Sequence, residues 1–315
     1  MKAVLPIVAL VAAATAGPVF APVAQAQGPE YQQVSKWPKN KPKKAPRYRK
    51  VQVSAVSTDQ QGRVFVFQRS RKPVLVFDRD GRFIQAWGKG FSAPHGCRVD
   101  PEGNVWLTDV DTHQVLKYSP EGERLLTLGV KWRSGSGPDR FNGPADVAFG
   151  PNGDVYVADG YYNSRVVRLS REGQYLGEWG QRGNAWGEFN LLHSIATDAA
   201  GRVYVADREN WRIQVFTPDG QFIRGWKVYQ RPFSVYVTPE QQLFVGDGTG
   251  NTVSIYTLEG RLLSRIRPGN QMNCAHMVTV DDQGCLYVAN LDGKRVHKLA
   301  PGPQLPPQHR QVLRH

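Results

Sequence analysis

Three of the seven histidines in the chain occupy one position of a repeated sequence unit. They are His95, His193 and His276, and each stands five residues before a Gly-containing turn. Other residues hold this position in the intervening units, namely Ser54, Ala145 and Phe233. Three imidazoles with one open coordination position are typical of a catalytic zinc site. The alternative is that the histidines only hydrogen-bond to one another or to water.

Two arginines and two tyrosines lie at a second shared level, just past the second strand expected in each unit. The arginines are Arg69 and Arg208, and the tyrosines are Tyr161 and Tyr162. Guanidinium groups beside a metal can hold a substrate carboxylate through bidentate contacts. A tyrosine near such charges can have a lowered pKa and act as a base. Alternatively, the arginines pair with local carboxylates such as Glu209, and the tyrosines only pack.

The repeated unit predicts the elements that position these residues. Its most regular segment recurs at spacings of 40 to 50 residues, a period typical of β-propeller blades; the segments are 64–70, 105–111, 155–161, 203–209, 243–249 and 286–292. Alternating apolar residues and Gly turns around each segment predict four short strands per unit. We therefore expect an all-β fold, a six-bladed β-propeller over residues 51–302. Every second blade is related by a third of a turn, so the three histidines should converge on the axis.

The sixth unit ends after its third expected strand, residues 295–300. Propellers avoid an exposed edge by borrowing a strand from the other terminus. We expect residues 31–37 to supply that strand, from within a basic, Pro-rich segment at 27–50. Residues 303–315 are expected to form a mobile tail.

The N-terminus has the features of a signal peptide. Lys2 is followed by an apolar stretch and by the small-residue pattern Ala24-Gln25-Ala26. We expect cleavage after residue 26, export to the periplasm or the extracellular space, and no stable membrane insertion afterwards. A retained N-terminal anchor is the alternative.

Composition excludes several other classes of protein. The chain has 315 residues, 40% of them hydrophobic, so it can build a packed core. Its only long apolar run is N-terminal, which excludes a multi-span membrane protein. Three cysteines exclude a disulfide-stapled scaffold. The net charge of +13 raises the question of nucleic acid, but export and the lack of helical DNA-binding signals argue against that partner.

Several longer motifs resemble the catalytic core of peptidyl-α-hydroxyglycine α-amidating lyase, and the blades are similar to NHL repeats. The motifs are FSAPHG (91–96), TDVDTHQVLK (108–117), VADGYYNSRVV (157–167), FNLLHS (189–194) and ADRENWRIQVF (206–216). The resemblance covers about residues 50–300. It implies a zinc ion on the three histidines, with Arg69, Arg208 and Tyr161 around it. The implied reaction splits a substrate with a terminal carboxylate into an amide and glyoxylate, and we expect a monomer.

The chain also departs from that family. Met277 follows the third histidine, where the family has an aspartate associated with structural calcium, so calcium is doubtful here. Tyr162 replaces a family cysteine, and Cys274 replaces a methionine. Cys97 and Cys285 either pair or remain free, and Cys274 is a candidate additional metal ligand.

Two other functions compete with the lyase. One is a non-catalytic exported propeller that binds a protein or an envelope polymer, with the histidines as a structural site. The other is a lactonase-type propeller hydrolase, which is weaker because such enzymes use carboxylate-rich calcium sites.

Overall fold

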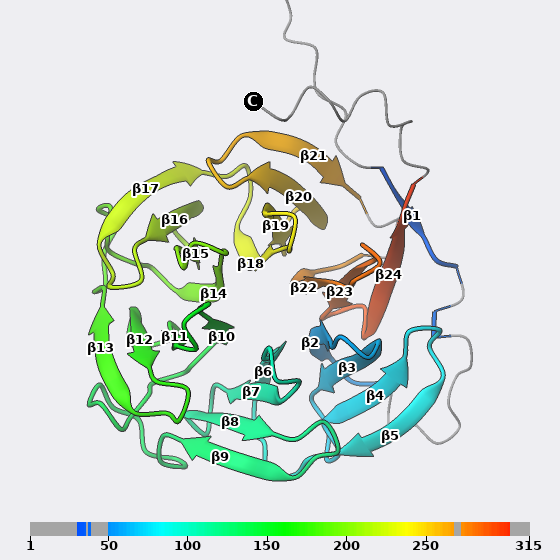
Figure 1. Cartoon of the computed structure of the whole chain (residues 1–315), viewed down its shortest axis with the longest axis horizontal. Helices are drawn as coiled ribbons and strands as arrows, with labels where there is room; N and C mark the ends of the chain where they lie inside the picture. Colours follow the sequence, from blue (N-terminus) through cyan, green and yellow to red (C-terminus); the bar gives the residue numbers. More distant parts are fainter. Residues whose placement is uncertain (1–29, 36, 39–49, 268–271, 303–315) are drawn as a thin grey trace, which may run out of the picture.

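The computed structural model describes residues 30–35, 37–38, 50–267 and 272–302. They form six four-stranded antiparallel sheets around a central channel, which confirms the predicted six-bladed propeller (Figure 1). No helix in these residues is long and apolar enough to cross a membrane. The expected signal peptide, residues 1–26, and the expected tail, residues 303–315, lie outside the described residues.

The four strands of each blade succeed one another from the axis outward. Blade one contains β2 Val53–Thr58, β3 Arg63–Gln68, β4 Val74–Asp78 and β5 Phe83–Trp87. Blade two contains β6 Pro94–Val99, β7 Val105–Asp109, β8 Gln114–Tyr118 and β9 Arg124–Leu128. Blade three contains β10 Asp146–Phe149, β11 Val155–Asp159, β12 Arg165–Leu169 and β13 Tyr175–Trp179. Blade four contains β14 Leu192–Thr197, β15 Val203–Asp207, β16 Arg212–Phe216 and β17 Phe222–Lys227. Blade five contains β18 Pro232–Val237, β19 Gln242–Asp247, β20 Thr252–Thr257 and β21 Leu262–Ile266. Blade six contains β22 Ala275–Val280, β23 Leu286–Asn290, β24 Arg295–Pro301 and β1 Tyr31–Gln33.

Burial follows the position of each strand in its blade. The second strands β7, β11, β15 and β23 are buried along their whole length because they face neighbouring blades on both sides. The outer strands β9, β13 and β17 are largely exposed. Apolar burial between blades therefore supplies most of the stability, as in other repeat proteins.

The first turn of several blades is tied to the core by one aspartate. Asp198 accepts a hydrogen bond from the buried Tyr204 hydroxyl at 3.0 Å, and Asp281 accepts one from Tyr287 at 3.1 Å. In blade two, the Trp106 indole donates to Asp100 at 2.9 Å. These pairs satisfy the polar ends of large buried aromatics, which would otherwise lose hydration. The repeated aspartates are thus structural.

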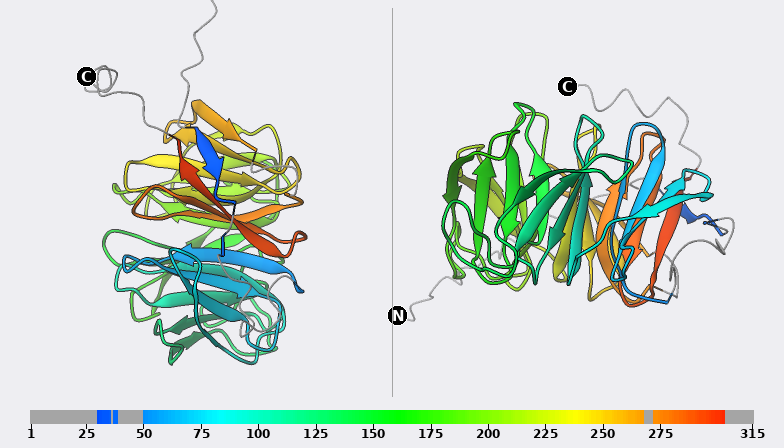
Figure 2. Two further views of the ribbon diagram at one scale, coloured as in Figure 1. Left: turned by 90° about the vertical axis from the view of Figure 1, so that its right-hand side faces the viewer. Right: turned by 90° about the horizontal axis from the view of Figure 1, so that it is seen from below.

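The ring closes through the N-terminal segment. β1 pairs with β24, with Tyr31 opposite Pro301, and becomes the outer strand of blade six. The side views show β1 lying along the rim of the disc (Figure 2). Trp37 then packs at ring-centroid distances of 5.6 Å from Phe77 and 5.5 Å from Tyr287. The segment therefore joins the last blade to the first.

Removal of the Trp37 side chain should weaken this closure. Trp37 is only 5% exposed, and its indole donates to the Arg79 carbonyl at 3.1 Å. Trp37→Ala should cost about 3–5 kcal/mol of unfolding free energy in urea titrations, as buried Trp-to-Ala changes do. Trp132, which is 61% exposed, is the matched control, and its change to Ala should cost less than about 0.5 kcal/mol. Equal losses in the two variants would show that the Trp37 contacts do not hold the ring.

Candidate metal centre

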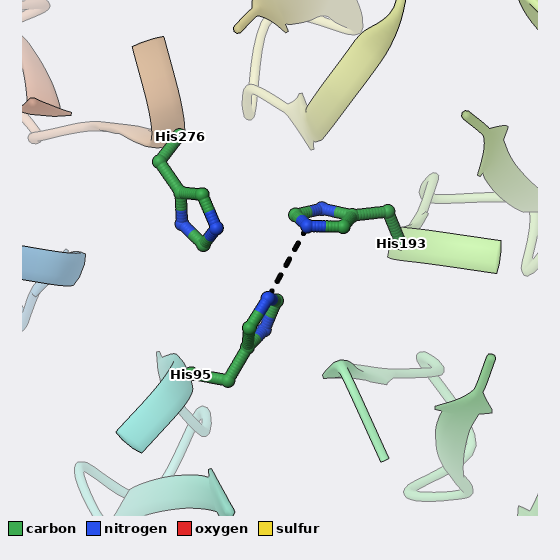
Figure 3. Close-up of side chains that lie close together, drawn as sticks. All are labelled: His95, His193 and His276. Atoms are coloured by element: carbon green, nitrogen blue, oxygen red, sulfur yellow. Dashed lines mark hydrogen bonds between the residues drawn. The ribbon is translucent and has the colours of Figure 1, made fainter. Parts of the chain in front are cut away.

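The three predicted histidines meet at the channel axis. His95 lies in β6, His193 in β14 and His276 in β22, and their rings point toward one another (Figure 3). The Nε2 atoms of His95 and His193 are 3.2 Å apart, and one ligand atom from each histidine lies within 4.8 Å of the others. Tetrahedral zinc with bonds of 2.0–2.1 Å separates its nitrogen ligands by about 3.4 Å. The three side chains can therefore hold a metal ion.

A β-bulge aims each of these histidines at the axis. In β14, Leu192 pairs with Asp207 and Ser194 pairs with Ala206, so His193 has no partner of its own. The same irregularity falls at His276 in β22 and at His95 in β6. A bulged residue leaves the regular alternation of the strand, and its side chain is turned to a new direction. The same bulge also falls at Ser54 and Phe233, so the histidine blades differ from these two blades in the side chain at the bulge and not in its backbone.

Backbone carbonyls of the intervening blades fix the orientation of the rings. The distances from Nδ1 to the acceptor oxygen are 2.7 Å for His95 to Ala145, 2.6 Å for His193 to Phe233 and 2.6 Å for His276 to Ser54. A carbonyl can only accept, so Nδ1 carries the proton and Nε2 presents its lone pair to the axis. Ala145, Phe233 and Ser54, which hold the histidine position in the other three blades, therefore orient the histidine rings.

The histidines are neutral at physiological pH. Burial lowers the pKa of His276 to about 4, and it also holds the pKa of His95 and of His193 well below the usual value. The positive charges of Arg69 and Arg208 act in the same direction on His276. Neutral imidazole is the form that binds a metal ion, so the site does not have to lose protons before binding.

Tyr161 completes the centre on one side. Its hydroxyl lies 2.9 Å from Nε2 of His95 and 3.3 Å from Nε2 of His193. Burial raises the pKa of this hydroxyl, and the charges of Arg208 and Arg69 offset only part of that rise. The backbone allows this close approach through Gly160, where a Cβ atom would stand 1.7 Å from the carbonyl oxygen of Leu192, next to His193.

Arg208 is held from two sides. Its Nε atom is 2.9 Å from Glu209, and its guanidinium lies 4.8 Å from the ring centroid of Phe233. Glu209 also pairs with Arg231 at 3.2 Å. The alternative of a local ion pair therefore applies to Arg208. The same side chain also acts to lower the pKa of Tyr161 through its charge.

Arg69 has a neutral partner and is more exposed. Its Nη1 atom donates to Gln52 at 2.7 Å, and Gln52 in turn donates to Asp292 of blade six at 3.0 Å. Its positive charge also acts to lower the pKa of His95, His276 and Tyr161. The two arginines thus face the same centre with different surroundings, one ion-paired and one open to solvent.

The other singled-out residues lie away from the metal ligands. Tyr162 is 62% exposed, so its ring is on the surface beside Tyr161. Cys97, Cys274 and Cys285 are buried and free, which makes the Cys97–Cys285 pairing wrong. Cys274 is not part of the cluster, and burial raises the pKa of its thiol to about 12, which disfavours the thiolate needed for metal binding.

Some functional features could not be read from the residue types. Phe233 shares the axial position and lies 5.0 Å from His193 and 5.9 Å from His276 between ring centroids, so it forms an apolar wall of the centre. Its place in the repeat was the only sequence signal for this role. The motifs DGYYNSR and DRENWR, which carry Tyr161 and Arg208, also have a structural part: Asp159 and Asp207 each accept hydrogen bonds from an asparagine of the turn and from the arginine that begins the next strand.

Comparisons with known proteins agree with this architecture. The NHL repeat model matches residues 141–169 and 189–216. Human NHL repeat-containing protein 3 is 34% identical over 292 residues, which cover 84% of this chain and 82% of that protein. Peptidyl-alpha-hydroxyglycine alpha-amidating lyase 1 of Drosophila melanogaster is 33% identical, covering 78% of this chain and 56% of that protein. A solved streptogramin B lyase matches 87% of this chain and 97% of its own at a TM-score of 0.62 and 15% identity, which shows the fold alone. The chain belongs to the NHL-repeat propeller family.

Proposed function

We propose that the protein is a zinc-dependent carbon–nitrogen lyase. Its substrate would be a peptidyl-α-hydroxyglycine or a related α-hydroxyamide, and its products an amide and glyoxylate. One observation carries the proposal: the Tyr161 hydroxyl lies 2.9 Å and 3.3 Å from two histidine Nε2 atoms that face the metal position. A purely structural metal site has no need of a half-buried phenol at its open side.

The donor set fits zinc. Three neutral imidazoles with carbonyl-bound Nδ1 atoms form a set that zinc commonly accepts, and they leave a position for substrate. A zinc ion held there would stabilise negative charge on the substrate hydroxyl oxygen. The Drosophila relative, a peptidyl-alpha-hydroxyglycine alpha-amidating lyase, supports this class of reaction, while human NHL repeat-containing protein 3 adds support for the fold only.

The residues of the chain account for the proton transfers. The substrate has the form R–CO–NH–CH(OH)–COO⁻. Tyr161 would act as phenolate once a cation held by the histidines offsets the burial that raises its pKa. In that form it takes the hydroxyl proton, the oxygen electrons form the aldehyde carbonyl, and the C–N bond breaks. The same proton then passes to the amide nitrogen, so the products are R–CO–NH₂ and glyoxylate. Arg208 and Arg69 stabilise the phenolate form through their charge.

The arginines also give a site for the terminal carboxylate. Arg69 is exposed and is held by the neutral Gln52, so its charge is available to an anion that arrives from solvent. Arg208 already pairs with Glu209, which leaves its other nitrogens to face Tyr161 and the substrate. Two guanidinium groups beside one centre therefore favour a substrate that ends in a carboxylate.

The direct test is a glyoxylate-release assay on α-hydroxyhippurate, run with metal analysis of the same sample. We expect equal amounts of benzamide and glyoxylate, with zinc bound near one equivalent. Chelation should abolish release, and zinc should restore it. No release from any α-hydroxyglycine derivative by zinc-loaded protein would favour the exported binding propeller instead.

A further inference from the structure

A single arginine is surrounded by hydrogen-bond acceptors from the inner strands of several blades. Arg98 lies in β6, three residues after His95, and its side chain is only 8% exposed. It makes a two-point contact with the fully buried Asp146, with Nε to Oδ1 at 3.0 Å and Nη2 to Oδ2 at 2.7 Å. This paired geometry is the strong form of an ion pair between a guanidinium and a carboxylate.

The same guanidinium reaches three further blades. Nη2 lies 3.2 Å from the Ser194 hydroxyl and 3.0 Å from the Val235 carbonyl oxygen, and Nη1 lies 3.1 Å from the Val278 carbonyl oxygen. The acceptors therefore come from β10, β14, β18 and β22, while the arginine comes from β6. One side chain on the axis thus links the inner strands of five blades.

Every partner atom in this ring is an oxygen. Carboxylate, hydroxyl and carbonyl oxygens are the ligands that hard cations such as calcium take in proteins. In this channel, the positive charge they surround belongs to the chain itself. A cavity of about 140 Å³ lies next to Arg98 and is lined by Ser57, Thr197 and Thr279, with no histidine among its lining residues. Arg98 is itself one of the residues that line this cavity.

We propose that Arg98 is the resident cation of the channel, and that it takes the place of a structural metal ion in tying the blades together. The oxygen cage and a calcium ion do not fit together in this chain, because the guanidinium already occupies the cage. It follows that a variant in which the Arg98 side chain is truncated should contain an empty cation site that accepts free guanidinium or calcium.

The experiment compares the melting temperatures of wild type and Arg98→Ala with and without added cations. Truncation leaves Asp146 buried without a counter-charge, so the melting temperature should fall by roughly 6–20 °C for a chain of this size. Millimolar, non-denaturing guanidinium or calcium should recover part of that loss relative to sodium chloride. Wild type and Arg82→Ala, whose partners Asp78 and Asp80 are both partly exposed, should show no such recovery.

If Arg98→Ala does not fold, a comparison of Arg98→Met with a double variant tests the role of Arg98 instead. Arg98→Met with Asp146→Asn removes both charges, so the double variant should be more stable than Arg98→Met alone. Zinc content at the histidines, measured in each folded variant, should stay near that of wild type, which separates this proposal from the lyase. Additive losses in the double variant, or a folded Arg98→Ala that no cation stabilises, would overturn the role of Arg98.

Discussion

Replacing Tyr161 with phenylalanine should lower the rate of glyoxylate release by about 10²–10⁴-fold, the usual cost of losing a general base. The change removes only the hydroxyl that lies 2.9 Å from His95 and 3.3 Å from His193. The ring stays, so its packing against Gly143 and the next inner strand should survive. We therefore expect unchanged zinc content and melting temperature, with the loss in kcat rather than in KM.

The adjacent Tyr162 provides the matched control. It undergoes a chemically identical change, but its ring is 62% exposed, and the histidine contacts at the centre come from Tyr161 instead. Tyr162→Phe should keep turnover within about twofold, since it removes one surface hydroxyl. Wild-type rates in both variants would exclude Tyr161 as the proton acceptor. A large loss in both would instead indicate that the whole turn had shifted.

The fold was predictable because the same pattern of strands and turns recurs in six units of the sequence. Each unit repeats a buried second strand after a tight first turn, and four of the six turns begin with an aspartate, so a pattern that is weak in one unit becomes strong by recurrence. The histidines could be found by the same logic, because His95, His193 and His276 depart from the repeat at one position. Departures from a repeated pattern are visible only when the pattern itself is strong.

The other features of the site depend on strand pairing and on contacts between blades, which residue types do not reveal. The bulges at the histidines are set by strand pairing, and the carbonyl acceptors at Ala145, Phe233 and Ser54 have no side-chain signature. Arg98 stands in an ordinary strand sequence, yet it contacts acceptors 48 to 180 residues away along the chain. Such sequence separations explain why its role was not predicted.

The ion pair of Arg208 shows that a structural and a functional role need not exclude each other. The sequence left open whether this arginine pairs with Glu209 or serves the centre. The structure gives it both: Glu209 holds Nε at 2.9 Å, and the Phe233 ring supports the guanidinium face at 4.8 Å. A guanidinium fixed on one edge and one face has few remaining orientations, so its free nitrogens are directed at the centre without further ordering on substrate binding.

Replacing His193 with alanine should abolish high-affinity zinc binding and all zinc-dependent turnover. Among the residues that the structure describes, His193 supplies one of the three histidine nitrogens of the cluster. Loss of an outer-shell partner already weakens metal sites by about 10–100-fold, so loss of a ligand should weaken this one by more. Zinc content after dialysis and glyoxylate release should both fall to background, while the β-sheet circular-dichroism spectrum stays, because apolar burial between blades holds the ring.

His297 offers a control with the opposite outcome. It is buried in blade six, where its ring contacts Gln33 of the closing strand and Asn290 at 3.1 Å each. His297→Ala should keep zinc and turnover but lose about 1–3 kcal/mol of unfolding free energy, because buried polar partners lose a hydrogen bond. The two changes delete the same side chain, so a metal effect confined to His193→Ala assigns the ion to the axis. Loss of the β-sheet signal in His193→Ala would show that the metal also holds the propeller together.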